Sequence, residues 1–438
     1  MTGPAPARPP DVAQPDRPAR ATYRSVFAVR EFRVMAAAMF MYVLGFEFEV
    51  LGLSVLVFTR TRSALWTALA FSAGFAPQAV GGALFTALAD RLPPRLVIGA
   101  GLLIRAVPGL VIGLWPGLPI PVMLALVAAA ATTAPVFTAA LSGLLPELLD
   151  GDRYILGRSV FGLTGSATQL ADLGAGGAIL AVVPARWLLV AAGGALAAGA
   201  ALIRLGLRPR PARKAPGSGQ REPEREQVQG RKQAQGRKRG LIRDTLAGHA
   251  ELLASPDVRG LLLAQWLPAW FVAGAESLIV PYTASLGHPA RAAAPLLAAV
   301  PAGMLLGDLL AARFCPPAAR RRLAFPLVVV MGAPLLALPF RPALLLAALA
   351  LLACGAGFAY QLGLQQAFLD ALPESRHGQG FGLNSTGAMG GQGLVPAVAG
   401  ALAGVLGAGA GMAIAGAATI AAALALHDPL TGRGTPPA

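Results

Sequence analysis

Long apolar blocks, separated by short polar stretches, run along most of the chain. The first block covers 34–59, between Arg33 and Arg60, and its 26 residues would extend about 39 Å as a helix, enough to cross the ~30 Å hydrocarbon core of a bilayer. Eleven further blocks lie near 64–89, 96–115, 120–145, 157–183, 186–205, 258–286, 291–313, 323–340, 342–368, 376–403 and 407–426. This pattern predicts an all-α membrane protein with 12 transmembrane helices.

A long polar segment divides the predicted helices into two sets of six. The predicted divisions are a disordered cytoplasmic tail (1–32), a six-helix bundle (33–205), a mostly disordered cytoplasmic linker (206–257), a second six-helix bundle (258–426) and a cytoplasmic tail (427–438). Short motifs recur in both halves in the same order. For example, Leu145-Pro146-Glu147 matches Leu372-Pro373-Glu374, 227 residues later. The recurrence predicts two parallel six-helix repeats around a central site.

Composition and charge exclude two other classes of protein. Only 13 % of the residues are charged and 55 % are hydrophobic, whereas a soluble domain is about one quarter charged, so a water-soluble enzyme is excluded. The net charge of +15 does not indicate nucleic-acid binding. With the N-terminus placed inside, 30 of the 36 Lys and Arg residues fall on inner segments and 5 on outer loops, which predicts that both termini are cytoplasmic.

Six ionisable residues lie inside predicted spans, where each costs at least ~2.5–3.5 kcal/mol and is normally functional or paired. Glu49 lies 16 residues after Arg33, and Glu276 lies 17 residues after Arg259, so the two halves carry a carboxylate at similar depth. The complete set is Glu47, Glu49, Arg105, Asp172, Glu276 and Asp308. All of them except Asp308 are the candidates for a proton and substrate pathway.

Helical geometry limits how the first two glutamates can act. Glu47 and Glu49 lie about 200° apart around one helix, so at most one can point straight into a central cavity, and Arg105 is placed to neutralise the other. Two interpretations stay open for these acids: proton coupling, or a structural role as an ion pair or a hydrogen-bonded neutral acid. Asp308, five residues before Arg313, is interpreted as part of a cytoplasmic gate or as a structural pair.

The second predicted helix ends in Leu88-Ala89-Asp90-Arg91, and Arg95 follows. With six plus six helices and a long central linker, the chain from 22 to 427 resembles the major facilitator superfamily, and within it the bacterial drug and metabolite exporters. The resemblance implies a monomer in a bacterial plasma membrane. It also implies a cytoplasmic gate in which Asp90, Arg91 and Arg95 pair with neighbouring helix ends.

Polar side chains inside the remaining blocks have two readings, as cavity lining or as contacts that hold helices together. They are Tyr42, Gln78, Gln169, Gln265, Trp270, Tyr360, Gln361 and Asn384. Prolines within the blocks predict bends, at Pro77, Pro108, Pro135, Pro268, Pro334 and Pro396.

These features predict a secondary active transporter rather than an enzyme. No Gly-x-x-x-x-Gly-Lys-Ser/Thr loop is present, so we expect no cofactor and the proton gradient as the energy source. The leading hypothesis is proton-coupled efflux of a small amphiphilic drug or secondary metabolite by alternating access, with antibiotic resistance as its consequence. The alternatives are uptake by proton symport and a non-transporting receptor or scaffold. The expected partners are the lipid bilayer, a small-molecule substrate and protons, and no nucleic acid.

Overall fold

A computed structural model describes residues 22–85, 92–149, 153–154, 156–157, 160–161, 183–211, 249–373 and 377–432. Within these ranges the chain is almost entirely helical and contains no β-strand. The all-α class predicted from the apolar blocks is therefore confirmed.

The N-terminal half of the chain forms one bundle. Its described helices are α1 (Tyr23–Phe27), α2 (Arg30–Thr61), α3 (Ala64–Ser72), α4 (Ala76–Phe85), α6 (Pro94–Leu114), α7 (Ile120–Ala131), α8 (Ala134–Leu148) and α10 (Ala185–Gly206). Helices α2 and α6 both pack along α10. Close packing is possible because Gly109 on α6 and Gly193 on α10 let the two backbones meet, where an added Cβ would lie within 3 Å of the other helix.

The C-terminal half forms the second bundle. Its elements are α12 (Pro256–Ser277), α13 (Ile279–Ser285), η2 (Ala290–Ala293), α14 (Ala294–Phe314), α15 (Pro317–Gly332), η3 (Ala333–Phe340), α16 (Leu344–Ala356), η4 (Gly357–Ala359), α17 (Tyr360–Ala371), α18 (His377–Leu406), α19 (Ala408–Ala425) and α20 (His427–Thr431). Helix α12 packs against α18 and α19, and α14 packs against α16.

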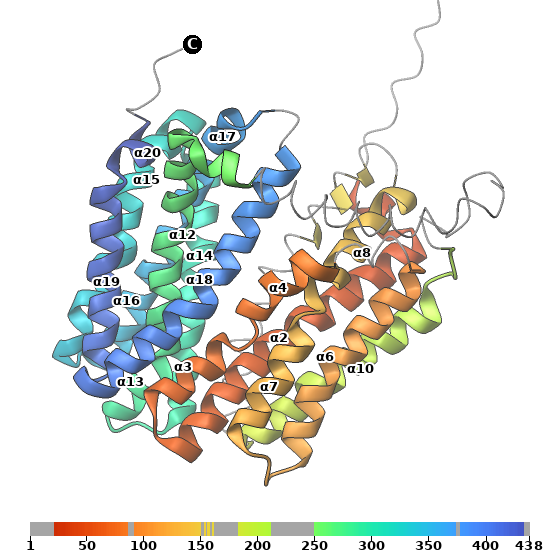
Figure 1. Ribbon diagram of the computed structural model, residues 1–438, viewed down its shortest axis with the longest axis horizontal. Helices are drawn as coiled ribbons and strands as arrows, with labels where there is room; N and C mark the ends of the chain where they lie inside the picture. Colours follow the sequence, from red (N-terminus) through yellow and green to blue (C-terminus); the bar gives the residue numbers. More distant parts are fainter. Residues whose placement is uncertain are drawn as a thin grey trace, which may run out of the picture.

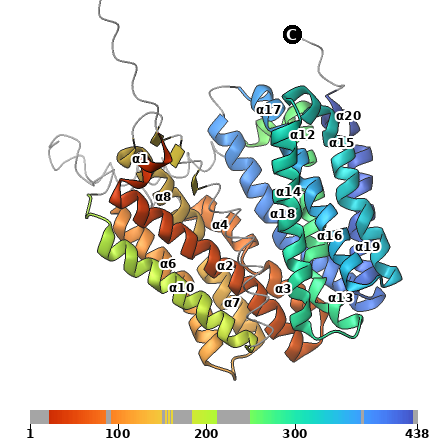
Figure 2. The same ribbon diagram turned by 180° about the vertical axis from the view of Figure 1, so that it is seen from behind.

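The two bundles meet at one end of the molecule and diverge toward the other, as Figures 1 and 2 show from opposite sides. We call the first end the closed end (residues 59–65, 115–119, 285–289 and 340–343). We call the second the linker end (residues 207–211, 249–257 and 432). Helix α18 packs against α3 and α4, and α13 and η2 pack against α2. Each of these contacts joins one half to the other.

Small residues make the contact between the halves close. A Cβ added to Gly393 would lie 2.4 Å from the Cβ of Ala76, and one added to Gly400 would lie 2.7 Å from the Cβ of Ala68. Both glycines are on α18, and both alanines are on helices of the other half. Because Gly393 and Gly400 carry no side chain, α18 can approach the helices of the N-terminal half this closely.

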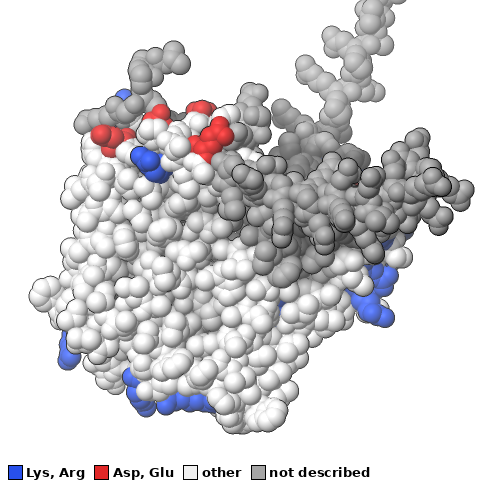
Figure 3. Space-filling model, in the orientation of Figure 1, with Lys and Arg blue, Asp and Glu red and all other residues white. Residues whose placement is uncertain are grey.

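Nine helices among the described residues are long and apolar enough to cross a membrane, and α12 with α13 makes a tenth span bent by 42°. Figure 3 shows one face of the molecule, on which charged side chains gather toward the two ends and leave an uncharged band between them. Such a band suits a hydrocarbon environment. The predicted fifth block, 157–183, lies almost wholly outside the described residues, so the predicted number of 12 helices stays a prediction.

Several predicted boundaries differ from the observed ones. Helix α1 and the first turn of α2 fall in the segment 1–32 that was assigned to a disordered tail, and α20 falls in the predicted tail 427–438. Turns at 73–75 and 132–133 interrupt the second and fourth blocks, shortly before Pro77 and Pro135. Proline disfavours helical geometry in the residue before it, which accounts for these breaks. In contrast, Pro108, Pro268 and Pro396 lie inside continuous helices.

Candidate functional site

A cavity of about 180 Å³ lies between the two halves, and both contribute to its walls. The N-terminal half supplies Phe46, Glu47, Val50, Leu51, Ser54, Phe71 and Phe75. The C-terminal half supplies Ala269, Ala273, Glu276, Ser277, Val280, Leu297, Pro301, Met304, Phe358 and Gln392. The lining is thus mainly apolar, with one carboxylate from each half.

The two carboxylates reach the cavity because of helical spacing. On α2, Glu47, Val50 and Ser54 follow one another at intervals of three and four residues, which places them on one face. On α12, Ala269, Ala273 and Glu276 do the same. Glu47 and Glu276 are both half-buried. Within the described chain, the Glu276 carboxylate has no hydrogen-bond or ion-pair partner.

Glu49, two residues after Glu47 on α2, faces away from the cavity into its own bundle. Glu49 is 3 % exposed and lies 3.7 Å from the guanidinium of Arg105, which is 1 % exposed and comes from α6. That distance is too long for a hydrogen bond. Among the described residues, Oε2 of Glu49 and all three guanidinium nitrogens of Arg105 have no hydrogen-bond partner. The pair is a buried, weakly coordinated ion pair inside the N-terminal half.

Aromatic rings connect this ion pair with the cavity wall. The guanidinium of Arg105 lies 5.6 Å from the ring centroid of Phe46, a cation–π distance. The Phe46 ring meets that of Phe75 edge-to-face at 5.8 Å, and Phe71 is 6.0 Å from Phe75. All three phenylalanines line the cavity. The N-terminal wall therefore offers an aromatic surface beside Glu47.

Most of the polar residues predicted as cavity lining in the C-terminal half instead join helices to one another. The Gln265 side chain accepts a hydrogen bond from the Asn384 amide (3.1 Å), and the Tyr360 hydroxyl donates to the Gln265 carbonyl (2.9 Å). The Trp270 indole N–H donates to the carbonyl of Gly387 (3.1 Å). None of these residues lines the cavity described above. They fit the alternative reading, in which such side chains hold helices together.

Tyr42, Gln78 and Gln361 are also absent from the described residues that line the cavity. Tyr42 stacks on Phe137 with ring centroids 4.6 Å apart, and the Gln78 side chain donates to the Gly74 carbonyl of its own turn (2.7 Å). Gln361 is half-buried at the start of α17. Gln169 lies outside the described residues.

The predicted cytoplasmic gate is only partly visible. Arg95 donates a hydrogen bond to the carbonyl of Arg204 at the end of α10, the kind of contact with a neighbouring helix end that was expected. The predicted pair of Asp308 and Arg313 does not form: Asp308 is exposed, and the guanidinium of Arg313 lies over Phe314. A separation of five residues puts the two side chains on different faces of α14, which explains the error. Asp90, Arg91 and Asp172 lie outside the described residues.

Sequence reasoning missed several cavity residues. Ser54 is 3 % exposed, and its hydroxyl has no hydrogen-bond partner in the part of the chain that the structure describes. It lies seven residues after Glu47 on the same face of α2. That spacing is a signal that could have identified it. The aromatic wall and Met304 carry no such signal, because apolar residues fill every face of a transmembrane helix.

The profile of the Major Facilitator Superfamily matches residues 32–371. The chain belongs to the Major Facilitator Superfamily. A comparison with curated protein sequences finds no significant match.

Among solved structures, this superfamily member is similar to two kinds of transporter. One is a POT family transporter in complex with a thioalcohol-conjugated peptide, with a TM-score of 0.67, 12 % identity, and coverage of 91 % of this chain and 95 % of that chain. The other is a bacterial homologue of the human lysosomal transporter Spinster, in an inward-facing and unoccupied conformation, with a TM-score of 0.63, 17 % identity, and the same coverage of both chains. Family and fold together identify a membrane transporter and not an enzyme.

Proposed function

We propose that this transporter exports a small amphiphilic molecule that carries a positive charge, such as a drug or secondary metabolite, in exchange for protons. The observation that supports the proposal is the pair of carboxylates, Glu47 and Glu276, on one otherwise apolar cavity between the halves. No Lys, Arg or His is among the described residues that line it. Carboxylates on an otherwise apolar wall attract a positive ligand and disfavour an anionic one.

The rest of the cavity fits the apolar part of such a molecule. The rings of Phe46, Phe71 and Phe75 give a face that attracts both hydrocarbon and an organic cation. On the other side, Met304 adds a flexible and polarizable contact. An amphiphilic cation would therefore place its charge between the carboxylates and its apolar body against the aromatic wall.

Competition at the carboxylates would couple the export to protons. A carboxyl group removed from water takes up a proton more readily, and a protonated carboxyl no longer attracts a cation. Because Glu47 and Glu276 belong to opposite halves, rocking of the halves would present both groups first to one compartment and then to the other. Protons entering from outside would then displace the substrate, and the substrate would displace protons inside.

The arrangement of the halves fits one state of this cycle. The bundles touch at the closed end and diverge toward the linker end (Figure 1). The distribution of basic residues predicts that the linker end is cytoplasmic. We infer that this conformation receives substrate from the cytoplasm of a bacterial cell.

The test uses the purified protein in proteoliposomes with an imposed pH gradient and ethidium as the probe cation. We expect gradient-driven ethidium movement from the wild-type protein, and we expect Glu276→Gln and Glu47→Gln each to reduce it at least tenfold. Asp428→Asn, an exposed acid on α20, is the matched control and should leave transport unchanged. Unaltered gradient-driven transport by both cavity variants would refute the proposed coupling.

The orientation of the vesicles determines the direction of transport. Efflux predicts accumulation in inverted vesicles, whereas uptake by symport predicts accumulation in right-side-out vesicles. Absence of proton-driven movement for a panel of organic cations, in either orientation, would favour the receptor or scaffold alternative.

A further inference from the structure

A groove runs along the outer face of the N-terminal bundle, between α6 and α10, and it ends at the linker end. It has a volume of about 750 Å³. Its apolar part is lined by Leu96, Gly99, Ala100, Leu103, Ala197, Ala200 and Ala201. It lies on the linker-end side of the point where Gly109 and Gly193 bring the two helices together.

The sequence makes this groove out of small residues flanked by large ones. Gly99, Ala100 and Ala201 leave a shallow floor, whereas Leu96 and Leu103 are 55 % and 53 % exposed along its side. These leucines lie on a helix that is long and apolar enough to span a membrane, so they face lipid chains. A groove of this shape and chemistry suits an acyl chain.

A second, polar cavity of about 430 Å³ adjoins the groove at the linker end. The two share Arg95, Arg204 and Pro209 in their linings. The polar cavity is completed by Val29, Arg30, Glu31, Leu205, Gly206, Leu207 and Arg208. The apolar groove therefore opens directly into a basic compartment at the end of the membrane-spanning helices.

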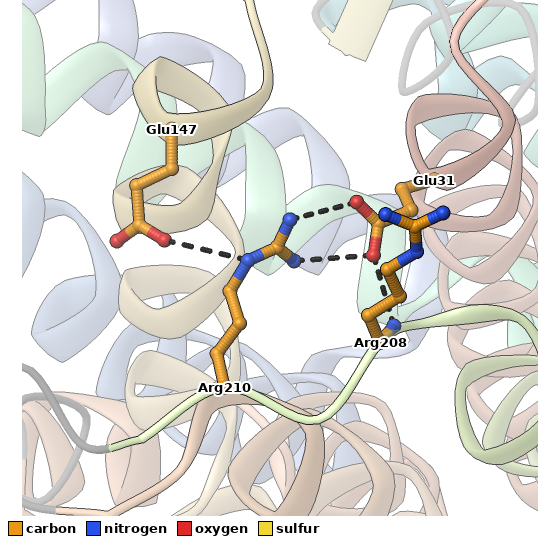
Figure 4. Close-up of polar contacts among 4 residues, drawn as sticks. All are labelled: Glu31, Glu147, Arg208 and Arg210. Carbon is orange, nitrogen blue, oxygen red and sulfur yellow. Dashed lines mark hydrogen bonds and ion pairs between the residues drawn. The ribbon is translucent and has the colours of Figure 1, made fainter.

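Glu31 is the single acid among the described residues that line this compartment, and Arg210 neutralises its charge (Figure 4). The Glu31 carboxylate accepts two hydrogen bonds from the Arg210 guanidinium, at 3.2 and 2.7 Å, and one from the backbone N–H of Arg208, at 2.9 Å. The Nε of Arg210 also lies 3.9 Å from a carboxylate oxygen of Glu147. The positive charge of Arg210 is thus paired with acids of the protein itself.

Three of the remaining arginines keep their charge available. Arg30, Arg204 and Arg208 are exposed. Arg208 lies close enough to Glu31 to interact with its charge, whereas the guanidinium groups of Arg30 and Arg204 form no ion pair with an acid among the described residues. Arg95 contacts a backbone carbonyl, and no acid among the described residues forms an ion pair with it. Figure 3 shows basic side chains at this edge of the N-terminal half. Three positive charges, those of Arg30, Arg95 and Arg204, therefore lie at the mouth of the apolar groove without a paired acid among the described residues.

We propose that this groove is a binding site for an anionic phospholipid. The phosphate lies between Arg95 and Arg204, where bidentate hydrogen bonds from guanidinium groups are favourable, and an acyl chain follows the groove between α6 and α10. Basic pockets between transmembrane helices are suited to anionic headgroups, at about 1 kcal/mol per basic residue. The continuity of the basic compartment with the apolar groove selects a lipid over a free phosphate. The site is separate from the central cavity and does not depend on its function.

The test measures lipid binding to the purified full-length protein by native mass spectrometry. The probes are phosphatidylglycerol and phosphatidylcholine with identical acyl chains, together with glycerol phosphate as a headgroup without chains. We expect tight binding of phosphatidylglycerol, at least tenfold weaker binding of phosphatidylcholine, and no binding of glycerol phosphate at the same concentration.

Variants of the basic compartment and of the groove separate the two parts of the site. Arg204→Gln removes a side chain without intramolecular partners and should weaken phosphatidylglycerol binding about fivefold, and addition of Arg95→Gln should bring the loss to about thirtyfold. Gly99→Leu fills the groove and leaves all arginines in place, and it should also weaken phosphatidylglycerol binding. The matched controls are Arg186→Gln and Gly194→Leu, both nearer the opposite end of α10, where no atom lies within 4 Å of a Cβ added at Gly194.

Two results would overturn the proposal. Equal binding of phosphatidylglycerol and phosphatidylcholine would show only non-selective lipid around the protein. Equal effects of the groove variants and the matched controls would place the selective lipid elsewhere. Thermal unfolding of each variant without added lipid separates loss of binding from loss of folding.

Discussion

The buried pair of Glu49 and Arg105 gives the sharpest stability prediction. Removing one partner of a buried ion pair typically costs about 3–5 kcal/mol, because the other charge is left without compensation. Replacing both partners with apolar residues of similar size is often neutral, or stabilising by about 1–4 kcal/mol. At 3.7 Å and with no hydrogen bonds to the guanidinium, this pair recovers little of its desolvation cost. We therefore expect the double variant Glu49→Met/Arg105→Met to be at least as stable as the parent protein.

The two single variants should differ from each other. A carboxylate left alone can be neutralised by binding a proton, whereas a guanidinium does not release its proton at accessible pH. Glu49→Met, which leaves Arg105 charged, should therefore be the more destabilising change. The cation–π contact with Phe46 offsets only a small part of this cost, at about 1–2 kcal/mol.

The assay is thermal unfolding of the four proteins in one detergent, analysed as a double-mutant cycle, with ethidium transport measured in parallel. A double variant that is less stable than both single variants would refute this reasoning. A Glu49→Met variant as stable as the parent protein would refute it as well. The transport result distinguishes the two interpretations of the pair. If the double variant is stable and still transports ethidium, the pair is structural. If it is stable but no longer transports, the pair has a role in the transport cycle.

Two further predictions concern the ends of the molecule. Gly400→Leu should push α18 away from α3, because a Cβ at this position already lies 2.7 Å from an alanine side chain. Spin labels on cysteines introduced at Thr59 and His288, in a background without native cysteines, should then report longer distances across the closed end, and an unchanged distribution would contradict the contact. Arg210→Lys keeps the charge but loses the paired hydrogen bonds at the linker end, so we expect a loss of about 1 kcal/mol in thermal stability. Equal unfolding temperatures for this variant and the parent protein would show that the positive charge stabilises the linker end without the paired hydrogen bonds, which would contradict the prediction.

The sequence located the important side chains more reliably than it assigned their directions. The apolar blocks and the mid-span acids indicated the part of α2 that contributes to the cavity, and helical geometry required that Glu47 and Glu49 face different ways. Which of them faces the cavity could not be predicted, because the helical period fixes the angle between two positions but not the rotation of the helix about its axis. The matching depths of Glu49 and Glu276 favoured the wrong partner: the carboxylate that shares the cavity with Glu276 is Glu47.

By itself, the sequence determined the membrane class, the all-α fold, the division into two halves and the presence of costly charges at membrane depth. These features follow from the length of apolar blocks and from the distribution of charges, which are local properties of the chain. The tertiary structure decided which faces of the helices line the cavity, which aromatic rings form its wall, and where the two halves touch. In a soluble protein the polar face of a helix marks the outside, but lipid and protein interior are both apolar, so only packing distinguishes the buried face of a transmembrane helix from the exposed one.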